Sequence, residues 1–222
     1  MADATPTFVF FYGSCISSES RARTGLSGLC LPCTVSGFVR TWSASIDLTK
    51  HSAMLVNTKV TGITAVSAQA SAGGVCNGVI VQIDPSELPR FDEREAGYDQ
   101  RSLPASAIKL LRPEQDAASF PVETAQLWIY VHPEGSPTAA FPVPQTYLDV
   151  MLLGCCEYSE AFAEEFIRTT TGWGAEPSSF IDDRATPAYV RASGEAKARA
   201  EDWDAMLQKH APDALAARVV VG

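Results

Sequence analysis

The chain has 222 residues, of which 46% are hydrophobic and 19% charged, and 17 Lys and Arg stand against 26 Asp and Glu, so the formal net charge is −9. A chain of this length buries a core without help from metals or disulfides, and its composition excludes disorder. An acidic chain repels phosphate backbones, so we expect no nucleic-acid partner. No apolar run approaches the ~20 residues that span a bilayer, so we also expect no membrane partner.

The first two thirds of the chain predict a sheet. Strand-like stretches, rich in β-branched and aromatic residues, cover Phe8–Tyr12, Val35–Ile46, Met54–Val66, Val75–Ile83, Leu103–Lys109 and Thr124–Val131. They do not alternate evenly with helices, which disfavours a doubly wound parallel sheet. We expect an α+β fold, with a small, mostly antiparallel, closed β-barrel and flanking helices.

Helices are predicted later in the chain. Asp84-Pro-Ser-Glu87 has the pattern of a helix start, and amphipathic or capped segments cover Gln145–Leu153, Ser159–Thr170 and Ala192–His210. Gly154 would end the first of these. The stretch between residues 171 and 189 reads as irregular.

The segment after Asp84 carries the first chemical signal. On a helix, Glu95 falls on the same face as Leu88 and Phe91, whereas Glu93 and Arg94 fall on the opposite faces. A carboxyl group that points inward has a raised pKa, which suits a general acid or base. The alternative is a solvated charge run near the end of a helix, and the segment alone leaves both readings open.

A second signal is the glycine at the end of the first strand. Gly13 follows the apolar run and lets the backbone turn tightly, so the amides of Gly13, Ser14 and Cys15 could bind an anion. No phosphate-loop pattern is present, so the anion would be a carboxylate. Tyr130 and Tyr147 are further candidates, because an inward-facing phenol seeks a hydrogen-bond partner; the alternatives are an ordinary turn and core tyrosines.

Six cysteines predict reduced thiols: Cys15, Cys30, Cys33, Cys76, Cys155 and Cys156. Cys30 and Cys33 have CxxC spacing, for which packing thiols are the favoured reading and a redox switch the alternative. No second pair completes a zinc site, so we expect no metal. The first residues lack an export signal, so we expect a cytoplasmic protein.

Taken together, these pieces resemble the γ-glutamylcyclotransferase-like family. The matching motifs, within residues 7–158, are Tyr12-Gly-Ser14, Gly37-Phe-Val-Arg-Thr-Trp42, Gly78-Val-Ile-Val-Gln-Ile83 leading to Leu88, Asp92-Glu-Arg-Glu-Ala-Gly-Tyr98, Leu127-Trp-Ile-Tyr130 and Tyr147. Cys15 departs from the family pattern, which bears on substrate preference. The resemblance implies a β-barrel with flanking helices in residues 1–170, and we expect residues 171–222 to pack on it as an extension.

The resemblance also implies a function. A γ-glutamyl compound would cyclise by intramolecular aminolysis, releasing 5-oxoproline and an amine or amino acid without a cofactor. Glu95 would be the general base and acid, and Tyr12, Gly13, Ser14, Cys15, Tyr130 and Tyr147 would bind substrate. Glutathione, a γ-glutamyl amino acid and a γ-glutamyl amine all stay open, as do monomer and homodimer. The alternatives are a related amide-processing enzyme on the same fold, or a binding protein whose C-terminal helix docks a partner through Trp203 and Leu207.

Overall fold

A mixed sheet forms the centre of the computed structural model, which describes residues 5–50, 59–87, 97–112, 120–121, 124–132, 135–174 and 176–221. The strand order is β4-β6-β1-β3-β2-β5, with β8 paired to β2. The strands are β1 (Thr7–Phe11), β2 (Cys30–Asp47), β3 (Gly62–Ile83), β4 (Asp99–Ser102), β5 (Ile108–Leu110), β6 (Gln126–Val131) and β8 (Thr170–Thr171).

The expected closed, mostly antiparallel barrel is wrong. β1 pairs antiparallel with β3 but parallel with β6, and β2 pairs parallel with β8, so the sheet is mixed. Among the described strands, the path runs from β4 to β5 without closing. Alternation along a strand shows which face is buried, but it contains no information about the direction of the neighbouring strand. The α+β class is confirmed, and the closure is not.

The long hairpin of β2 and β3 replaces several of the shorter predicted strands. Ser36 pairs with Val75 and Phe38 with Ala70, so the extra residues between Ala70 and Val75 bulge out instead of ending the strand. Gly73 permits this bulge, because its φ of 80° lies in the left-handed region. In the stretch predicted as a strand over Leu103–Lys109, a 3-10 helix covers Ala105–Ala107 and only the end is extended.

The strand predicted to be fully buried is buried. Phe8, Val9 and Phe10 in β1 are each at most 2% exposed. Their strand lies between β3 and β6, which hydrogen-bond to its two edges. This central position explains why β1 reads as a continuous apolar run, and it places the end of β1 in the interior of the molecule.

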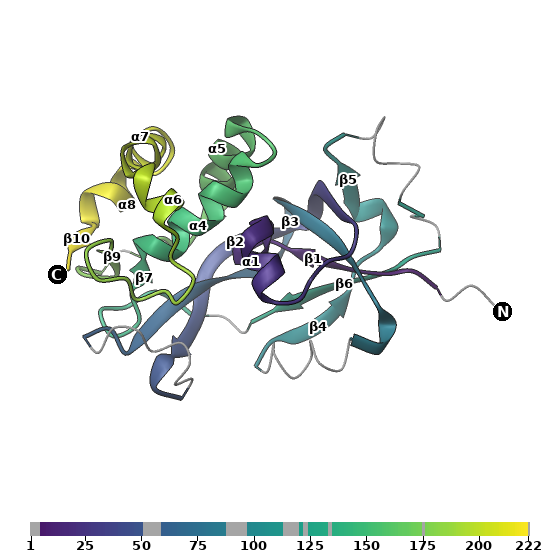
Figure 1. Ribbon diagram of the computed structural model, residues 1–222, viewed down its shortest axis with the longest axis horizontal. Coiled ribbons are helices and arrows are strands. Elements are labelled where there is room, and N and C mark those ends of the chain that lie inside the picture. The colour runs from purple at the N-terminus through teal and green to yellow at the C-terminus, as the bar shows by residue number, and fades with distance from the viewer. Residues whose placement is uncertain are drawn as a thin grey trace.

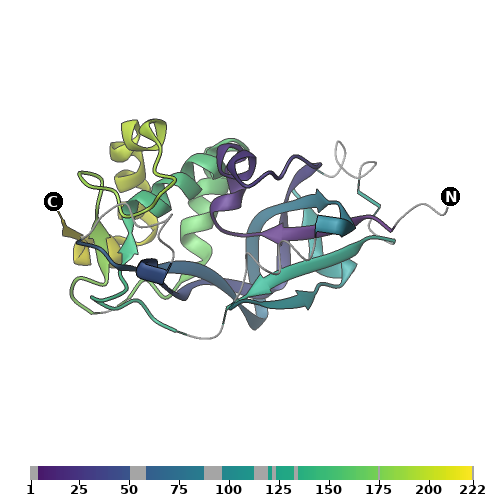
Figure 2. The same ribbon diagram turned by 60° about the horizontal axis from the view of Figure 1, so that its bottom comes forward.

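Helices and a small second sheet form the other end of the molecule, at the left of Figures 1 and 2. The helices at this end are α4 (Gln145–Cys156), α5 (Glu160–Thr169), α6 (Gly194–Ala198), α7 (Ala200–His210) and α8 (Pro212–Ala217), whereas α1 (Ser18–Arg23) lies near the middle of the molecule. The small sheet has the order β10 (Val219–Val220), β9 (Phe180–Asp182) and β7 (Val143–Pro144), all parallel. No helix in the described part of the chain is both long enough and apolar enough to cross a membrane.

The helix boundaries differ from the prediction at two positions, Gly154 and Arg199. α4 continues past Gly154, where a Cβ atom would lie 2.4 Å from the backbone nitrogen of Ser17. The glycine therefore permits close packing of α4 against the N-terminal segment instead of ending the helix. The helix predicted over Ala192–His210 is broken at Arg199, whose φ of −101° and ψ of 22° are not helical.

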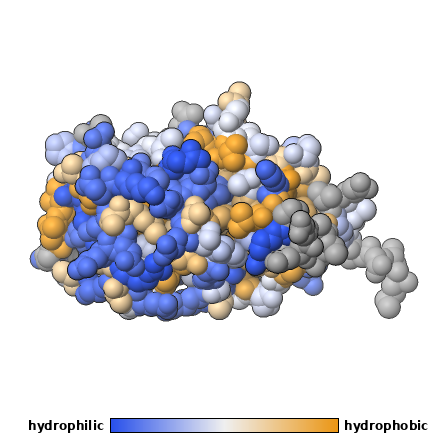
Figure 3. All heavy atoms as spheres, turned by 90° about the horizontal axis from the view of Figure 1, so that it is seen from above, coloured by the Kyte–Doolittle hydropathy of each residue, from blue (hydrophilic) through white to orange (hydrophobic). Residues whose placement is uncertain are grey.

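The C-terminal segment packs on the same core as the sheet. Trp203 and Leu207 are 0% exposed and belong to the main hydrophobic cluster, so they do not form a docking surface. The surface over the helices, at the left of Figure 3, is mainly hydrophilic. The division of the chain at residue 170 stays a prediction.

Candidate functional site

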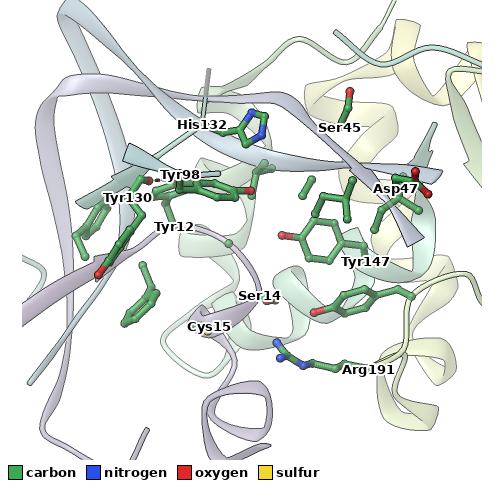
Figure 4. Close-up of a pocket in the computed structure, with 18 of the residues that line it drawn as sticks. Tyr12, Ser14, Cys15, Ser45, Asp47, Tyr98, Tyr130, His132, Tyr147 and Arg191 are labelled. Carbon is green, nitrogen blue, oxygen red and sulfur yellow. Dashed lines mark hydrogen bonds between the residues drawn. The ribbon is translucent and has the colours of Figure 1, made fainter. Parts of the chain in front are cut away.

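A cavity of about 460 Å³ lies where β1 ends, and Figure 4 shows the side chains around it. All six residues of the substrate-binding prediction line it: Tyr12, Gly13, Ser14, Cys15, Tyr130 and Tyr147. These residues come from the end of β1, from β6 and from α4. The structure thus brings together segments that are more than a hundred residues apart in the sequence.

The tight turn after β1 forms the floor of this cavity. Gly13 precedes a 3-10 helix over Ser14–Ile16. A Cβ atom at residue 13 would lie 3.1 Å from Val66 Cγ2 and 3.2 Å from the Tyr147 hydroxyl oxygen, so a larger residue would push these two side chains outward by a few tenths of an ångström. In the described part of the chain, the N–H groups of Gly13 and Ser14 donate to no acceptor. The turn therefore presents two backbone donors that have no acceptor among the described residues.

A buried arginine behind the turn fixes its orientation. Arg40 is 0% exposed, and its Nε donates to the Tyr12 carbonyl at 2.8 Å. Its other nitrogens donate to Asn77 and to the Phe166 carbonyl, and its guanidinium stacks on the Phe166 ring. In a trans peptide the N–H points opposite to the C=O, so the Gly13 N–H points away from Arg40.

Two of the predicted tyrosines support the cavity wall. The Tyr12 hydroxyl donates to the Tyr130 carbonyl at 2.5 Å, and this bond connects β1 to β6. The Tyr130 hydroxyl accepts from Gln100 Nε2 at 3.1 Å. Both rings are buried. Their contacts within the protein are consistent with a role in shaping the cavity.

Tyr147 differs from these two, because its hydroxyl faces the cavity. The side chain is 7% exposed, and its hydroxyl has no hydrogen-bond partner in the part of the chain that the structure describes. Burial raises the pKa of Tyr147 well above its usual value, and the nearby hydroxyls of Tyr189 and Tyr98 add to this effect. The phenol is therefore a neutral donor at physiological pH. In Figure 4 the hydroxyls of Tyr98 and Tyr147 point toward one another across the cavity.

The C-terminal segment supplies a wall of the cavity that the sequence did not reveal. Tyr189 and Arg191 line the cavity from the irregular stretch before α6. Burial raises the pKa of Tyr189, whose hydroxyl also interacts with Ser14 and Arg191. These two residues lie in a loop, so no periodic pattern marks them in the sequence. The signal that could have indicated a site was an aromatic residue and a cation close together in a long irregular stretch.

The predicted catalytic residue, Glu95, lies outside the described residues. Gly97 and Tyr98, which end the same motif, are described, and Tyr98 lines the cavity. Tyr98 also packs edge-on against His132, with 4.9 Å between the ring centroids. The end of the motif therefore reaches the cavity, and the position of Glu95 relative to it stays a prediction.

The CxxC pair has the features of packing thiols. Cys30 and Cys33 lie in β2, three residues apart, and side chains at that spacing point to opposite faces of a strand. Burial raises the pKa of both thiols, so they stay protonated and weakly nucleophilic. All six cysteines are free. Among the described residues, no cluster of His, Cys, Asp and Glu is suited to a metal ion.

Comparisons with known proteins identify the fold. Neither a protein-family model nor a curated protein sequence matches the chain. A solved structure described as a gamma-glutamyl cyclotransferase matches with a TM-score of 0.52 and 13% identity, over 89% of this chain and 99% of that chain. A Homo sapiens protein described as uncharacterized matches with a TM-score of 0.52 and 14% identity, over 88% of this chain and 98% of that chain.

The fold thus belongs to the α+β class, with a mixed sheet and helices at one end. More specifically, it is the γ-glutamylcyclotransferase-like fold. The similar structures cover most of this chain, so the match extends beyond residues 7–158, where the sequence motifs lie, and includes part of the C-terminal segment.

Proposed function

We propose that the protein is a γ-glutamylcyclotransferase-like enzyme that releases 5-oxoproline and an amine or amino acid from a γ-glutamyl compound. The observation that supports this most is the convergence of all six predicted substrate-binding residues, together with Tyr98, on one cavity. Its volume of about 460 Å³ falls in the range of small-molecule sites. The fold match adds support, since one of the similar structures is described as a gamma-glutamyl cyclotransferase.

In the proposed reaction, the α-amine of the γ-glutamyl group attacks its own γ-carbonyl carbon. A C–N bond closes the five-membered lactam, and the C–N bond to the leaving amine breaks. Glu95 accepts the proton that the α-ammonium loses and then donates it to the leaving nitrogen. Because the nucleophile and the electrophile belong to one molecule, correct orientation alone lowers the barrier by as much as ~7–11 kcal/mol.

The cavity floor supplies the donors that this reaction needs. The developing oxyanion would accept hydrogen bonds from the N–H groups of Gly13 and Ser14, which have no protein acceptor in the described part of the chain. The neutral Tyr147 hydroxyl, close to Gly13, would add a third donor. Tyr12, Tyr98 and Tyr130 would shape the cavity around the folded substrate.

The test is to incubate the protein with a panel of γ-glutamyl amino acids, γ-glutamyl amines and glutathione, and to measure 5-oxoproline. We expect release from at least one member of the panel, and we expect Glu95→Gln to reduce the rate by about 10²–10⁴-fold, the contribution of a general base. Glu93→Gln is the matched control. It removes the same charge only two residues from Glu95, and the Glu93 side chain is predicted to face water.

Two results would contradict the proposal. The absence of 5-oxoproline with every substrate would rule out the reaction. Full activity of Glu95→Gln, or an equal loss in Glu93→Gln, would remove Glu95 from the mechanism. Circular dichroism of both variants separates a loss of chemistry from a loss of folding.

A further inference from the structure

We propose that Arg191 is a specificity-determining residue that binds a carboxylate of the substrate, which makes the C-terminal segment part of the binding site. This inference rests on the proposed function for the identity of the substrate. Its physical basis, a cation on the cavity wall that pairs with no carboxylate of the described residues, is independent of that function.

The position of Arg191 is the first observation. The residue lines the cavity, and in Figure 4 its guanidinium points toward Ser14 and Cys15, at the floor formed by the turn after β1. Arg191 Nη1 donates to Ser20 Oγ at 3.2 Å, which anchors one side of the guanidinium against α1. The cation is thus oriented by the protein and is next to the backbone donors of the turn.

The partners of Arg191 are the second observation. In the described part of the chain its hydrogen bond goes to the Ser20 hydroxyl, the Tyr189 hydroxyl is close enough for the cation to lower the Tyr189 pKa, and no carboxylate lies within ion-pair distance. By contrast, Arg184 contacts Asp149 at 2.7 Å and Arg218 contacts Asp204 at 2.7 Å. A half-buried guanidinium that pairs with no described carboxylate retains N–H donors for an external anion.

The charge distribution around the cavity is the third observation. Lys50, another cation of the lining, is within 3.6 Å of Asp47 and its side chain is 78% exposed. The chain as a whole carries a net charge of −9, which repels an anionic ligand. A negatively charged substrate therefore needs a local cation to bind, and Arg191 is the described cation at the cavity floor.

The chemistry favours a carboxylate as the bound group. A guanidinium binds a carboxylate through two parallel N–H donors, and the hydroxyls of Tyr147 and Tyr189 are neutral donors beside it. A γ-glutamyl amino acid offers two carboxylates, the α-carboxylate of the γ-glutamyl group and the carboxylate of the leaving amino acid. If Arg191 binds the second, the enzyme prefers γ-glutamyl amino acids over γ-glutamyl amines.

The experiment is a calorimetric titration that compares three ligands in the Glu95→Gln background, where turnover is suppressed. The ligands are γ-glutamylalanine, the analogue with its alanine carboxylate converted to an amide, and the analogue with its α-carboxylate converted to an amide. We expect one of the two amides to bind about 10–100-fold more weakly than γ-glutamylalanine, the range for hydrogen bonds to a charged group. The weakened amide identifies the carboxylate that Arg191 binds.

Adding Arg191→Gln completes a double-mutant cycle. We expect this change to weaken the binding of γ-glutamylalanine by the same 10–100-fold range. It should also remove the difference in affinity between γ-glutamylalanine and the affected amide. Arg191→Lys should restore part of the affinity, because it restores the charge without the two parallel donors. Arg168→Gln is the matched control, since it removes one exposed cation that pairs with Glu165 away from the cavity lining.

Three outcomes overturn the inference: γ-glutamylalanine binds no more tightly than either amide, Arg191→Gln binds all three ligands with wild-type affinity, or the protein binds none of them. Failure of the proposed function looks different. It would appear as the absence of 5-oxoproline from the wild-type protein, with the dependence of binding on Arg191 intact, and it would leave a carboxylate-binding site of another activity.

Discussion

The two walls of the cavity are held by different kinds of interaction. The wall formed by the end of β1 and by β6 depends on uncharged partners, such as the Tyr12 hydroxyl on the Tyr130 carbonyl and Arg40 on the Tyr12 carbonyl. Although Arg40 is itself charged, its described hydrogen bonds all go to neutral oxygens.

The opposite wall, formed by α4 and the C-terminal segment, depends on ion pairs. Arg184 contacts Asp149 of α4 through two nitrogens, and it also contacts Asp204 of α7 at 3.0 Å. This network holds the segment that leads to Tyr189 and Arg191. The first wall should therefore be insensitive to pH, whereas the stability of the second should depend on the ionisation of its carboxylates.

Among the substitutions considered, the largest loss of stability should come from one in the first wall. We expect Arg40→Met to lower the free energy of unfolding by about 4 kcal/mol, because it removes the guanidinium donors of the buried Tyr12 and Asn77 carbonyls, at ~1–3 kcal/mol for each such group. Urea denaturation measures the loss. Arg101→Met is the matched control, because Arg101 is exposed and its ion pair with Asp99 is long.

If Arg40→Met prevents folding, Thr170→Val tests the same network more gently. Thr170 Oγ1 accepts from Arg40 at 3.3 Å and donates to the Phe166 carbonyl at 2.5 Å, so its removal should cost about 1 kcal/mol. A wild-type stability in both variants would show that Arg40 does not hold the turn.

The next effect should come from the ion pairs of the second wall. We expect Arg184→Gln to lower the free energy of unfolding by about 3 kcal/mol at pH 8, because it leaves the Asp149 charge buried and uncompensated. Burial raises the pKa of Asp149 to about 6, and the ion pair with Arg184 limits that increase. Urea denaturation of the wild type and the variant at pH 5 and pH 8 checks this expectation.

The sign of the pH dependence follows from the raised pKa. Asp149 has a native pKa above the unfolded value of ~3.9, so the folded protein binds its proton more tightly than the unfolded chain does. This contribution to the free energy of unfolding is present at low pH and is lost as the pH rises through the native pKa. Arg184→Gln raises the native pKa further, so the variant loses more stability between pH 5 and pH 8 than the wild type does. If the free energies of unfolding of the wild type and the variant differ by the same amount at pH 5 and at pH 8, the ion pair does not stabilise this wall.

The first wall was the more predictable from the sequence. Gly13 after a continuous apolar run indicated a turn at the end of a buried strand, and the structure confirms the turn. Local sequence indicates both features, since burial of β1 requires apolar side chains on both faces and glycine leaves room for the close approach of Tyr147. The direction in which β6 pairs with β1 is set by the whole chain, which is why the prediction of a mostly antiparallel sheet was wrong.

The second wall was largely beyond prediction. Arg191 reaches the cavity because Arg184, Asp149 and Asp204 hold the segment before it, and these residues are far apart in the sequence. Charged residues in an irregular stretch read as solvated, since nothing local indicates their partners. Trp203 and Leu207 show the same limit, because helical spacing marked them as an apolar face but did not reveal what would cover it.

The smallest effects should separate two tyrosines that the sequence treats alike. Tyr12→Phe removes a buried hydrogen bond to the Tyr130 carbonyl and should lower the free energy of unfolding by about 1 kcal/mol. Tyr147→Phe removes a hydroxyl that has no partner in the described part of the chain, so its stability should change by less than ~0.5 kcal/mol. Because that hydroxyl faces the cavity, Tyr147→Phe should instead weaken the binding of γ-glutamylalanine by about 5–10-fold.

Urea denaturation and calorimetric titration of both variants decide between the two roles. A tyrosine that shapes the wall changes the unfolding midpoint more than the affinity, and a tyrosine that contacts the ligand does the reverse. If Tyr147→Phe is destabilised as strongly as Tyr12→Phe and binds the ligand normally, then the Tyr147 hydroxyl is part of the wall. Of the three donors proposed for the oxyanion, the backbone N–H groups of Gly13 and Ser14 would then remain.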